Sequence, residues 1–393
     1  MLVMVVAAVG LRAQSVSDSL RVSLLTCSPG DEVYQLYGHT ALRVVDREQG
    51  LDVVFNYGVF DFRAPHFVWR FVLGECDYQV MAYPFEAFLE EYRVRGSQVM
   101  EQQLALMPDE TLRLCRNLFT NAQPQNRTYR YNFLSNNCTT RARDMVEQAV
   151  DGYVVYAEVE QPATYRTLLH HYTHGHPWAE VGNDMLLGAA CDTVLSGRAS
   201  QFLPEQLMNS LATAQIYDAQ SNRRPLVGAT RVILPACPKP VPVEDWQDVL
   251  LQRATPRACA LALLAVCLLT MAAEWRWRRM WWGLDVLLLT AQGVVGTLLC
   301  FMFLFSQHPT LDSNWQVLVL NPLPLVCMPW VVRCAWHRRR CAYHYVAVVV
   351  LLFFMVSMPW MPQIFSAPML PLALALWSRT VSYQMNINRL KKK

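Results

Sequence analysis

Long apolar segments in the last third of the chain place the strongest constraint on its fold. Each is close to the roughly 20 residues that a helix needs to cross the hydrocarbon core of a bilayer. Proline residues in the third segment predict a bend there. We therefore predict an all-α transmembrane region of about five helices. The predicted spans are residues 257–273, 283–305, 317–336, 342–358 and 367–383.

Positively charged residues gather on one side of these spans. Basic clusters follow the first, third and fifth spans, at residues 276–279, at 338–340 and in the tail 384–393. The intervening loops, 306–316 and 359–366, contain neither Lys nor Arg. Because basic loops stay on the cytoplasmic side of a membrane, the tail is expected to be cytoplasmic. Five crossings then leave the N-terminal part of the chain outside.

Residues 15–234 differ sharply from that region, because charged residues are spread through them as in a globular domain. The segment is long enough to bury a core of its own. The apolar stretch 1–14 resembles the hydrophobic and cleavage regions of a signal peptide. It lacks a basic leading region, so we expect the true start to lie upstream; the alternative is a buried first strand. Residues 235–256 form a predicted Pro-rich linker.

Composition gives no sign of nucleic acid, metal or cofactor. The net charge of +3 is small, and the basic residues lie mainly beside the apolar spans. Twelve cysteines occur without a CxxC pair. His170 and His174 are spaced to share one helix face, but no HExxH motif accompanies them. We therefore expect no metal, no cofactor and no nucleic-acid partner.

Local patterns in residues 15–234 predict a mixed α+β domain. β-Branched and aromatic residues favour strands, and the turn-forming residues 46–50 make residues 41–57 a hairpin. Helices are expected where apolar residues recur at intervals of three and four. Strands or extended segments are predicted at 20–25, 41–57 and 129–133, and helices at 84–92, 108–120, from 138 onward and over most of 162–215.

Cys138 lies at the predicted start of a helix. Apolar residues recur after it at Ala142, Met145, Val146 and Ala149, which describes one helix face. Either Ser135 or Asn137 can cap that helix. Free N–H groups and the helix dipole favour thiolate at such a position. Cys138 is therefore the candidate nucleophile, although most buried cysteines only fill space.

His39 begins a predicted strand and is the candidate base for that thiol. Pairing across the hairpin is expected to bring Asn56 near His39, where it can orient the imidazole; the alternative is an Asn that ends a strand. Asp61 and His66 are the reserve candidates for this orienting role. The Cys138 N–H and the Tyr37 hydroxyl are candidates to stabilise an oxyanion.

Several short motifs together resemble the Bacteroides-type lipoprotein N-acyltransferase family, Lnb, over nearly the whole chain. A strand His that precedes a helix Cys is also similar to the circularly permuted papain-like fold of NlpC-type hydrolases and lecithin:retinol acyltransferase. The motifs are Tyr37–Val44, Phe55–Phe62 and Asn136–Asp144, followed in the membrane region by His308–Pro309, Asn314–Trp315 and Asn321–Pro322.

This resemblance implies an α+β permuted papain-like domain in the periplasm, attached to a multi-pass region in the bacterial inner membrane. It implies acyl transfer from a phospholipid through a Cys thioester to the N-terminal amine of diacylglyceryl-cysteine lipoproteins. His39 and Cys138 match the catalytic pair of the family. The candidate substrate contacts are Asn137, Arg141, His308, Asn314 and Trp315.

Two other functions remain open at this point. The same Cys–His pair also suits a hydrolase, either a cell-wall amidase or peptidase or a phospholipase, and only the choice of acceptor separates it from a transferase. The third possibility is a membrane-anchored binding protein in which Cys138 is structural. The membrane region favours a lipid substrate among these.

Overall fold

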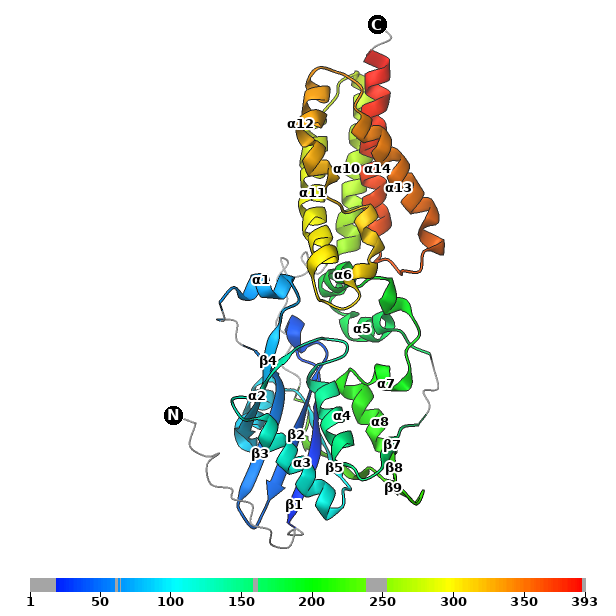
Figure 1. Ribbon diagram of the computed structural model, residues 1–393. Helices are drawn as coiled ribbons and strands as arrows, with labels where there is room; N and C mark the ends of the chain where they lie inside the picture. Colours follow the sequence, from blue (N-terminus) through cyan, green and yellow to red (C-terminus); the bar gives the residue numbers. More distant parts are fainter. Residues whose placement is uncertain (1–18, 61–62, 64, 158–161, 238–252, 391–393) are drawn as a thin grey trace. The chain divides into compact units, whose positions relative to one another are not determined.

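The computed structural model describes residues 19–60, 63, 65–157, 162–237 and 253–390 (Figure 1). The predicted signal peptide, the reserve candidate Asp61 and most of the predicted linker lie outside the described residues. The chain divides into two compact units. The sheet unit comprises Met1–Phe67, Cys76–Pro162 and Leu195–Pro240, and the membrane unit comprises Val68–Glu75, Ala163–Val194 and Val241–Lys393.

The sheet unit contains a seven-stranded antiparallel sheet with the strand order β10-β5-β1-β2-β3-β4-β6. The predicted hairpin is confirmed as β2 and β3. Its turn is held by Asp46, whose Oδ1 accepts from the Glu48 N–H at 3.0 Å, and Gly50 supplies a positive φ of 63°. The strands are β1 Leu20–Cys27, β2 His39–Asp46, β3 Leu51–Val59, β4 Asp77–Pro84, β5 Val99–Leu104, β6 Thr128–Arg130 and β10 Val227–Leu234.

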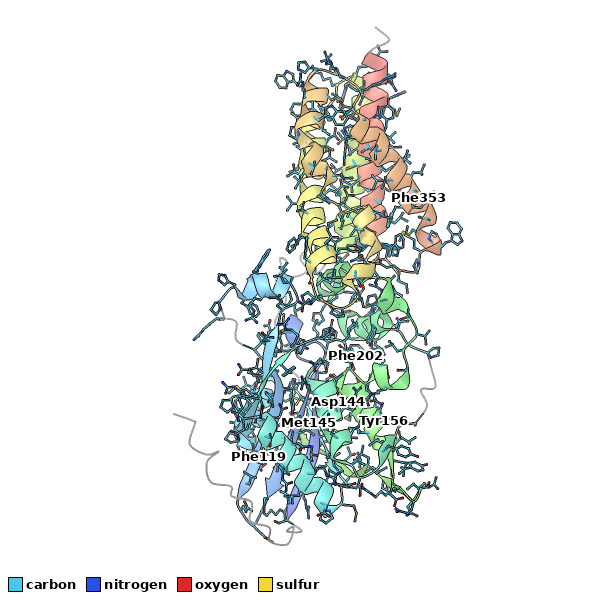
Figure 2. The ribbon with its side chains drawn as sticks, viewed as in Figure 1. Phe119, Asp144, Met145, Tyr156, Phe202 and Phe353 are labelled. Carbon is cyan, nitrogen blue, oxygen red and sulfur yellow. The ribbon has the colours of Figure 1, made fainter. Side chains whose placement is uncertain are left out.

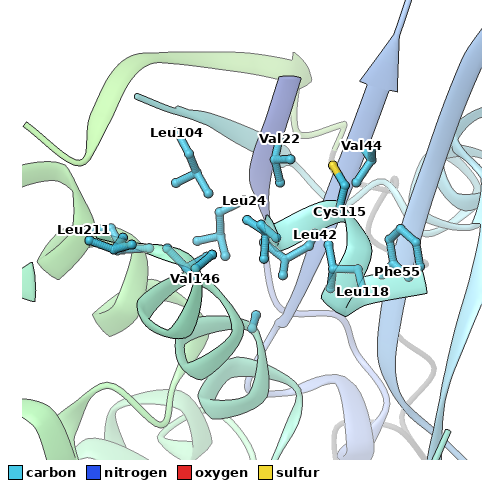
Figure 3. Packing of buried hydrophobic residues seen from close by; sticks show 14 of the residues in the cluster. Val22, Leu24, Leu42, Val44, Phe55, Leu104, Cys115, Leu118, Val146 and Leu211 are labelled. Atoms are coloured by element: carbon cyan, nitrogen blue, oxygen red, sulfur yellow. The ribbon is translucent and has the colours of Figure 1, made fainter. Parts of the chain in front are cut away.

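Helices cover both faces of this sheet, and each face has its own core. On one face, Leu24, Leu42 and Phe55 pack with residues of α3, α4 and α8, as Figure 3 shows for part of the cluster. On the other face, Leu25 and Val54 pack against α2. Alternation along each strand therefore buries both faces. The helices are α2 Phe85–Arg95, α3 Pro108–Asn121, α4 Cys138–Ala149 and α8 Pro204–Thr213, which confirms the predicted helices at these places.

A second, three-stranded sheet in the order β7-β8-β9 completes the sheet unit, together with the short helices η1 and α7. Tyr153 and Tyr217 pair across β7 and β8 with their rings stacked 5.7 Å apart. These elements are η1 Val33–Gln35, β7 Tyr153–Val155, α7 Gly197–Ser200, β8 Gln215–Tyr217 and β9 Arg223–Pro225.

The membrane unit contains a helical bundle, and four of its helical segments are long and apolar enough to cross a membrane. They are Pro256–Trp277, Trp282–Phe305, Trp315–Trp336 and Ala342–Trp360. Many of their apolar side chains point outward, as Phe353 of α13 does in Figure 2. The bundle helices are α10 Pro256–Trp277, α11 Trp282–Phe305, α12 Leu323–Trp336, α13 Ala342–Ser357 with the short η5 Met358–Trp360, and α14 Met369–Leu390.

The fifth predicted span corresponds to α14, which is not among the four apolar segments. Its buried Arg379 donates to Asp285 at 2.7 Å and to Glu274 at 2.9 Å. These carboxylates come from α11 and α10, and Ser382 donates to Glu274 at 2.6 Å. The polar side of α14 is therefore paired inside the bundle, where an unpaired charge would be costly.

The third predicted span is broken, in agreement with its proline content. It begins within the 3-10 turn η4 Trp315–Leu318, which follows a first such turn, η3 Leu311–Ser313, and it becomes α-helical only at α12. The break packs against α11, where a Cβ added to Gly296 would lie 2.2 Å from the Asn321 nitrogen. Glycine is therefore required for this close approach.

Residues 163–194 belong to the membrane unit, although the sequence pattern predicts them as part of residues 15–234. Inside the segment, buried Arg166 donates to Asp184 at 2.6 Å and to Asp192 at 2.7 Å. Asp192 in turn accepts from the Ile364 N–H of the membrane unit at 3.0 Å. A boundary after residue 234 does not describe this segment. Its helices are α5 Tyr165–Thr173, α6 Pro177–Leu186 and η2 Ala189–Asp192.

Side-chain amides of the membrane unit hold this segment through its carbonyl groups. Asn314 donates to the Met185 carbonyl at 2.8 Å, and Gln316 donates to the Asp184 carbonyl at 2.6 Å. Gln363 donates to the Leu187 carbonyl at 3.1 Å. Because buried carbonyl groups need partners, these amides fix α6 and the residue after it to two connections of the bundle, that between α11 and α12 and that between η5 and α14.

Candidate active site

Cys138 is the first residue of α4, where the sequence pattern predicts it. The preceding residue, Asn137, caps the helix: its Oδ1 accepts from the N–H groups of Thr139 and Thr140, both at 2.9 Å. The Arg141 N–H bonds to the Asn137 carbonyl at 3.0 Å. Of the N–H groups of residues 138–141 in the first turn, only that of Cys138 does not donate a hydrogen bond to Asn137. Cys138 is half-buried, at the positive end of the helix dipole.

His39 begins β2, and its Nε2 lies 2.5 Å from Asn56 Oδ1 on β3. The strand register places Ala41 opposite Asn56, so Asn56 lies diagonally across from His39, as the hairpin predicts. Since the amide oxygen only accepts, Nε2 carries the proton in this bond. The other ring nitrogen, Nδ1, is then left for the thiol.

Electrostatics favour the ionised pair of Cys138 and His39. Burial raises the pKa of the Cys138 thiol, but the charge of His39 and hydrogen bonds from His39, the Thr40 N–H and the Thr139 hydroxyl outweigh it. The pKa therefore falls from 9.0 to about 7. Burial lowers the pKa of His39, yet the thiolate and the bond to Asn56 raise it above 6.5 overall. Both shifts favour thiolate and imidazolium together.

The surroundings of the thiol include Thr40, Thr139 and Gly58, which the sequence pattern does not single out. Thr40 and Thr139 are buried, with their hydroxyl oxygens 3.1 Å apart, which ties β2 to the first turn of α4. Gly58 has a φ of 88°, and a Cβ added there would lie 3.6 Å from the Cys138 Cβ. Its positive φ accompanies the irregular pairing between Asn56 and Val59.

A row of half-buried aromatic rings is a second feature that sequence analysis misses. The rings of Tyr131 and Tyr78 stack with centroids 4.1 Å apart, and those of Tyr78 and Phe60 with centroids 4.9 Å apart. Burial raises the pKa of Tyr131, and the nearby Cys138 thiolate raises it further, so the row begins close to the thiol. Only tertiary structure brings these three residues together.

Tyr37 is half-buried and packs against Phe133, with ring centroids 5.0 Å apart. It lies just before Gly38, whose φ is 73° and where an added Cβ would lie 2.6 Å from the Cys27 carbonyl oxygen. Glycine is required at that turn into β2. Tyr37 thus lies at the turn that leads into His39. The stabilisation of an oxyanion by the Tyr37 hydroxyl stays a prediction.

The two candidate substrate contacts beside the thiol differ in availability. Asn137 is buried, and its Nδ2 donates to the Phe133 carbonyl at 2.7 Å and to the Phe202 carbonyl at 2.8 Å. Because both the oxygen and the nitrogen of its side-chain amide are bonded within the protein, Asn137 caps α4 and has no amide group turned to a substrate. Arg141 is half-buried, donates to Asn136 at 2.6 Å and lies over the Tyr129 ring at 4.3 Å.

The other candidate contacts lie in the membrane unit. Asn314 is buried and bonded to its neighbours, whereas Trp315 is exposed. His308 is half-buried, with Nε2 2.6 Å from the Phe71 carbonyl oxygen. Of the reserve candidates, His66 is exposed with a φ of 56°. Asn56 is the candidate whose side chain bonds to the His39 imidazole.

None of the twelve cysteines forms a disulfide bond. Among the described residues, no group of three His, Cys, Asp or Glu side chains is placed to hold a metal ion. His170 bonds instead to the buried Asp184 at 2.9 Å. Cys138, His39 and Asn56 together offer a thiolate, an imidazole and an amide.

Two family models match the chain. One, described as the Lnb N-terminal periplasmic domain, matches residues 10–171. The other, described as the Lnb transmembrane domain, matches residues 248–392. No curated protein and no solved structure matches the chain significantly. The first of these matches covers both the strand that carries His39 and the helix that carries Cys138.

Proposed function

This chain belongs to the Lnb family, and from that premise we propose that it is a lipoprotein N-acyltransferase. It is a membrane protein with a periplasmic N-terminal domain and a transmembrane C-terminal region. The observation that carries the proposal is the arrangement of Cys138, His39 and Asn56, in which the pKa of the thiol falls to about 7. A thiolate of this kind suits acyl transfer from an ester.

In the first half-reaction, the Cys138 thiolate attacks an ester carbonyl of a phospholipid. The carbonyl oxygen takes the negative charge, and the Cys138 N–H at the start of α4 is placed to stabilise it. When the intermediate collapses, the C–O bond breaks, and the His39 imidazolium gives its Nδ1 proton to the leaving alkoxide. The products are a lysophospholipid and a thioester on Cys138.

In the second half-reaction, the α-amine of a diacylglyceryl-cysteine lipoprotein attacks the thioester. Neutral His39 accepts a proton from the amine as the C–N bond forms. The C–S bond then breaks and returns the thiolate, so the pair regains its starting charges. Asn56 keeps Nδ1 directed at the sulfur through its bond to Nε2 in both steps.

The residues around the pair fit a lipid donor. The aromatic row Tyr131, Tyr78 and Phe60 offers an apolar surface for an acyl chain, beginning near the thiol. Arg141 is our candidate beside the thiol for contact with an anionic headgroup, and Tyr37 is our candidate for stabilising the oxyanion. A His at the start of a strand and a Cys at the start of a packed helix also support the permuted papain-like arrangement as our proposal for this domain.

We place the protein in the bacterial inner membrane, with five crossings and a cytoplasmic C-terminus. Phe71 and Leu73, in the part matched as periplasmic, bond to His308 and Gln307 directly after α11. That end of α11 is therefore periplasmic, in agreement with the basic clusters at the opposite ends of the spans. The count of five includes α14, whose charged residue is paired within the bundle.

The test is mass spectrometry of a model lipoprotein's N-terminal peptide, from cells that lack their own lipoprotein N-acyltransferase. We expect a third acyl chain with the wild-type protein and none with Cys138→Ala at equal membrane abundance. Cys237→Ala, which removes an exposed thiol, is the matched control and should retain transfer. Transfer by the Cys138→Ala protein would exclude the thioester route. Fatty acid release without transfer would favour the hydrolase instead.

A further inference from the structure

The short helix α1, Phe67–Val72, exposes apolar side chains. Val68 is 74% exposed, Trp69 is 55% exposed and Phe71 is 42% exposed. Large apolar side chains gathered on one short element mark a surface that contacts another apolar phase. The sequence pattern gives α1 no role, and the proposed active site does not use these side chains.

Contacts within the membrane unit fix α1 to the end of α11. The ring of Trp69 lies 5.3 Å from that of Phe301, and the Gln307 N–H donates to the Leu73 carbonyl at 2.8 Å. Gly74 has a φ of 71°, and a Cβ added there would lie 2.6 Å from the His308 nitrogen. This backbone contact holds the residues after α1 against the turn at 307–308.

The exposed face of α1 continues an exposed apolar surface at the end of α11. Leu304 and Phe305 end α11 and are exposed, on a helix apolar enough to cross the membrane. Trp69 packs beside the same last turns through Phe301. Tryptophan is favoured where a membrane meets water, because its ring is apolar and its N–H is polar.

We propose that α1 lies in the periplasmic leaflet of the bilayer, with Val68 and Trp69 in contact with phospholipid. The occupant of this surface is therefore bilayer lipid rather than another protein. α1 lies in the connection between β3 and β4, and β3 carries Asn56. A use of α1 in presenting the donor lipid to Cys138 rests on the proposed function, whereas the lipid contact does not.

Photocrosslinking tests the lipid contact without reference to activity. The full chain, with p-benzoylphenylalanine in place of Val68 or, separately, Trp69, is reconstituted in vesicles of phosphatidylethanolamine and phosphatidylglycerol and irradiated. Val94, which is 69% exposed on α2 in the sheet unit, is the matched control position. We expect phospholipid adducts at positions 68 and 69 and none at position 94. Absence of adducts at both α1 positions, equal labelling at position 94, or protein adducts alone would overturn the proposal.

A charged substitution in α1 tests whether the lipid contact helps to present the donor lipid to Cys138. Trp69→Glu should lower acyl transfer in vesicles by roughly tenfold, because a carboxylate is disfavoured at membrane depth. The rate at which a small water-soluble reagent alkylates Cys138 should not change, since the site itself is intact. Val94→Glu should leave both rates unchanged. Unchanged transfer by Trp69→Glu would refute a role in presentation, whereas absence of transfer by the wild-type protein would refute only the proposed function.

Discussion

Among its neighbours, His39 contributes most to the charge on Cys138, and so the ionisation of this thiol has a direct test. Below a pH of about 7 the thiolate takes up a proton and becomes a poor nucleophile; above that pH it remains charged. We expect the alkylation rate of Cys138 to rise with pH around a midpoint near 7. In His39→Gln the midpoint should move up towards the ordinary thiol value, because the stabilising cation is lost.

The measurement is the rate of iodoacetamide labelling, followed by mass spectrometry of the peptide that contains Cys138. Cys237 is exposed and serves as an internal control whose labelling should not respond to His39→Gln. An unchanged Cys138 midpoint in His39→Gln would show that the histidine does not set the ionisation of the thiol.

Asn56 acts on the imidazole through a single bond, that from Nε2 to Oδ1 at 2.5 Å. We expect Asn56→Ala to lower kcat for acyl transfer by about tenfold to a hundredfold with little change in KM, because proton transfer needs an oriented imidazole. Asn56→Asp retains an acceptor oxygen and should restore part of the loss. Equal activity of the wild-type and Asn56→Ala proteins would show that Asn56 does not position the His39 imidazole.

At the scale of the element, the first turn of α4 depends on the Asn137 side chain, which makes four hydrogen bonds. Asn137→Ala should lower the free energy of unfolding by about 1–2 kcal/mol, since it removes a helix cap. Thermal unfolding of the full chain in detergent measures this. Ser196→Ala removes the cap of the short α7 and is the matched control, expected to have a smaller effect. Equal shifts in the two variants would contradict this account of α4.

At the scale of the whole molecule, Arg166 holds the segment 163–194 together. It is buried with Asp184 and Asp192, and removing one partner of a buried pair costs about 3–5 kcal/mol. Arg166→Leu should therefore release the segment, seen as faster proteolysis within residues 163–194. Arg198→Leu breaks half-exposed ion pairs with Asp144 and Glu147 and should have little effect. Equal protection of the segment in the Arg166→Leu and wild-type proteins would contradict this role.

Local patterns predict much of this molecule. Apolar length identifies the four helical segments that are long and apolar enough to cross a membrane. Alternation and turn residues identify the β2–β3 hairpin, and a helix-start pattern places Cys138 at the head of α4. Local patterns do not decide whether Ser135 or Asn137 caps the helix, because the Asn137 side chain is held by the carbonyl groups of Phe133 and Phe202. Phe202 lies far along the chain, where no local pattern points to it.

The sequence by itself determined that a globular segment precedes membrane helices, and which residues begin the strand and helix of the site. These are properties of neighbouring residues, and each follows from the periodicity of one element. Only tertiary structure decided that the aromatic row meets the thiol and that α5, α6 and α1 join the membrane helices. The physical reason is that such contacts follow from the pairing of buried charges, carbonyl groups and apolar faces across long distances in the chain.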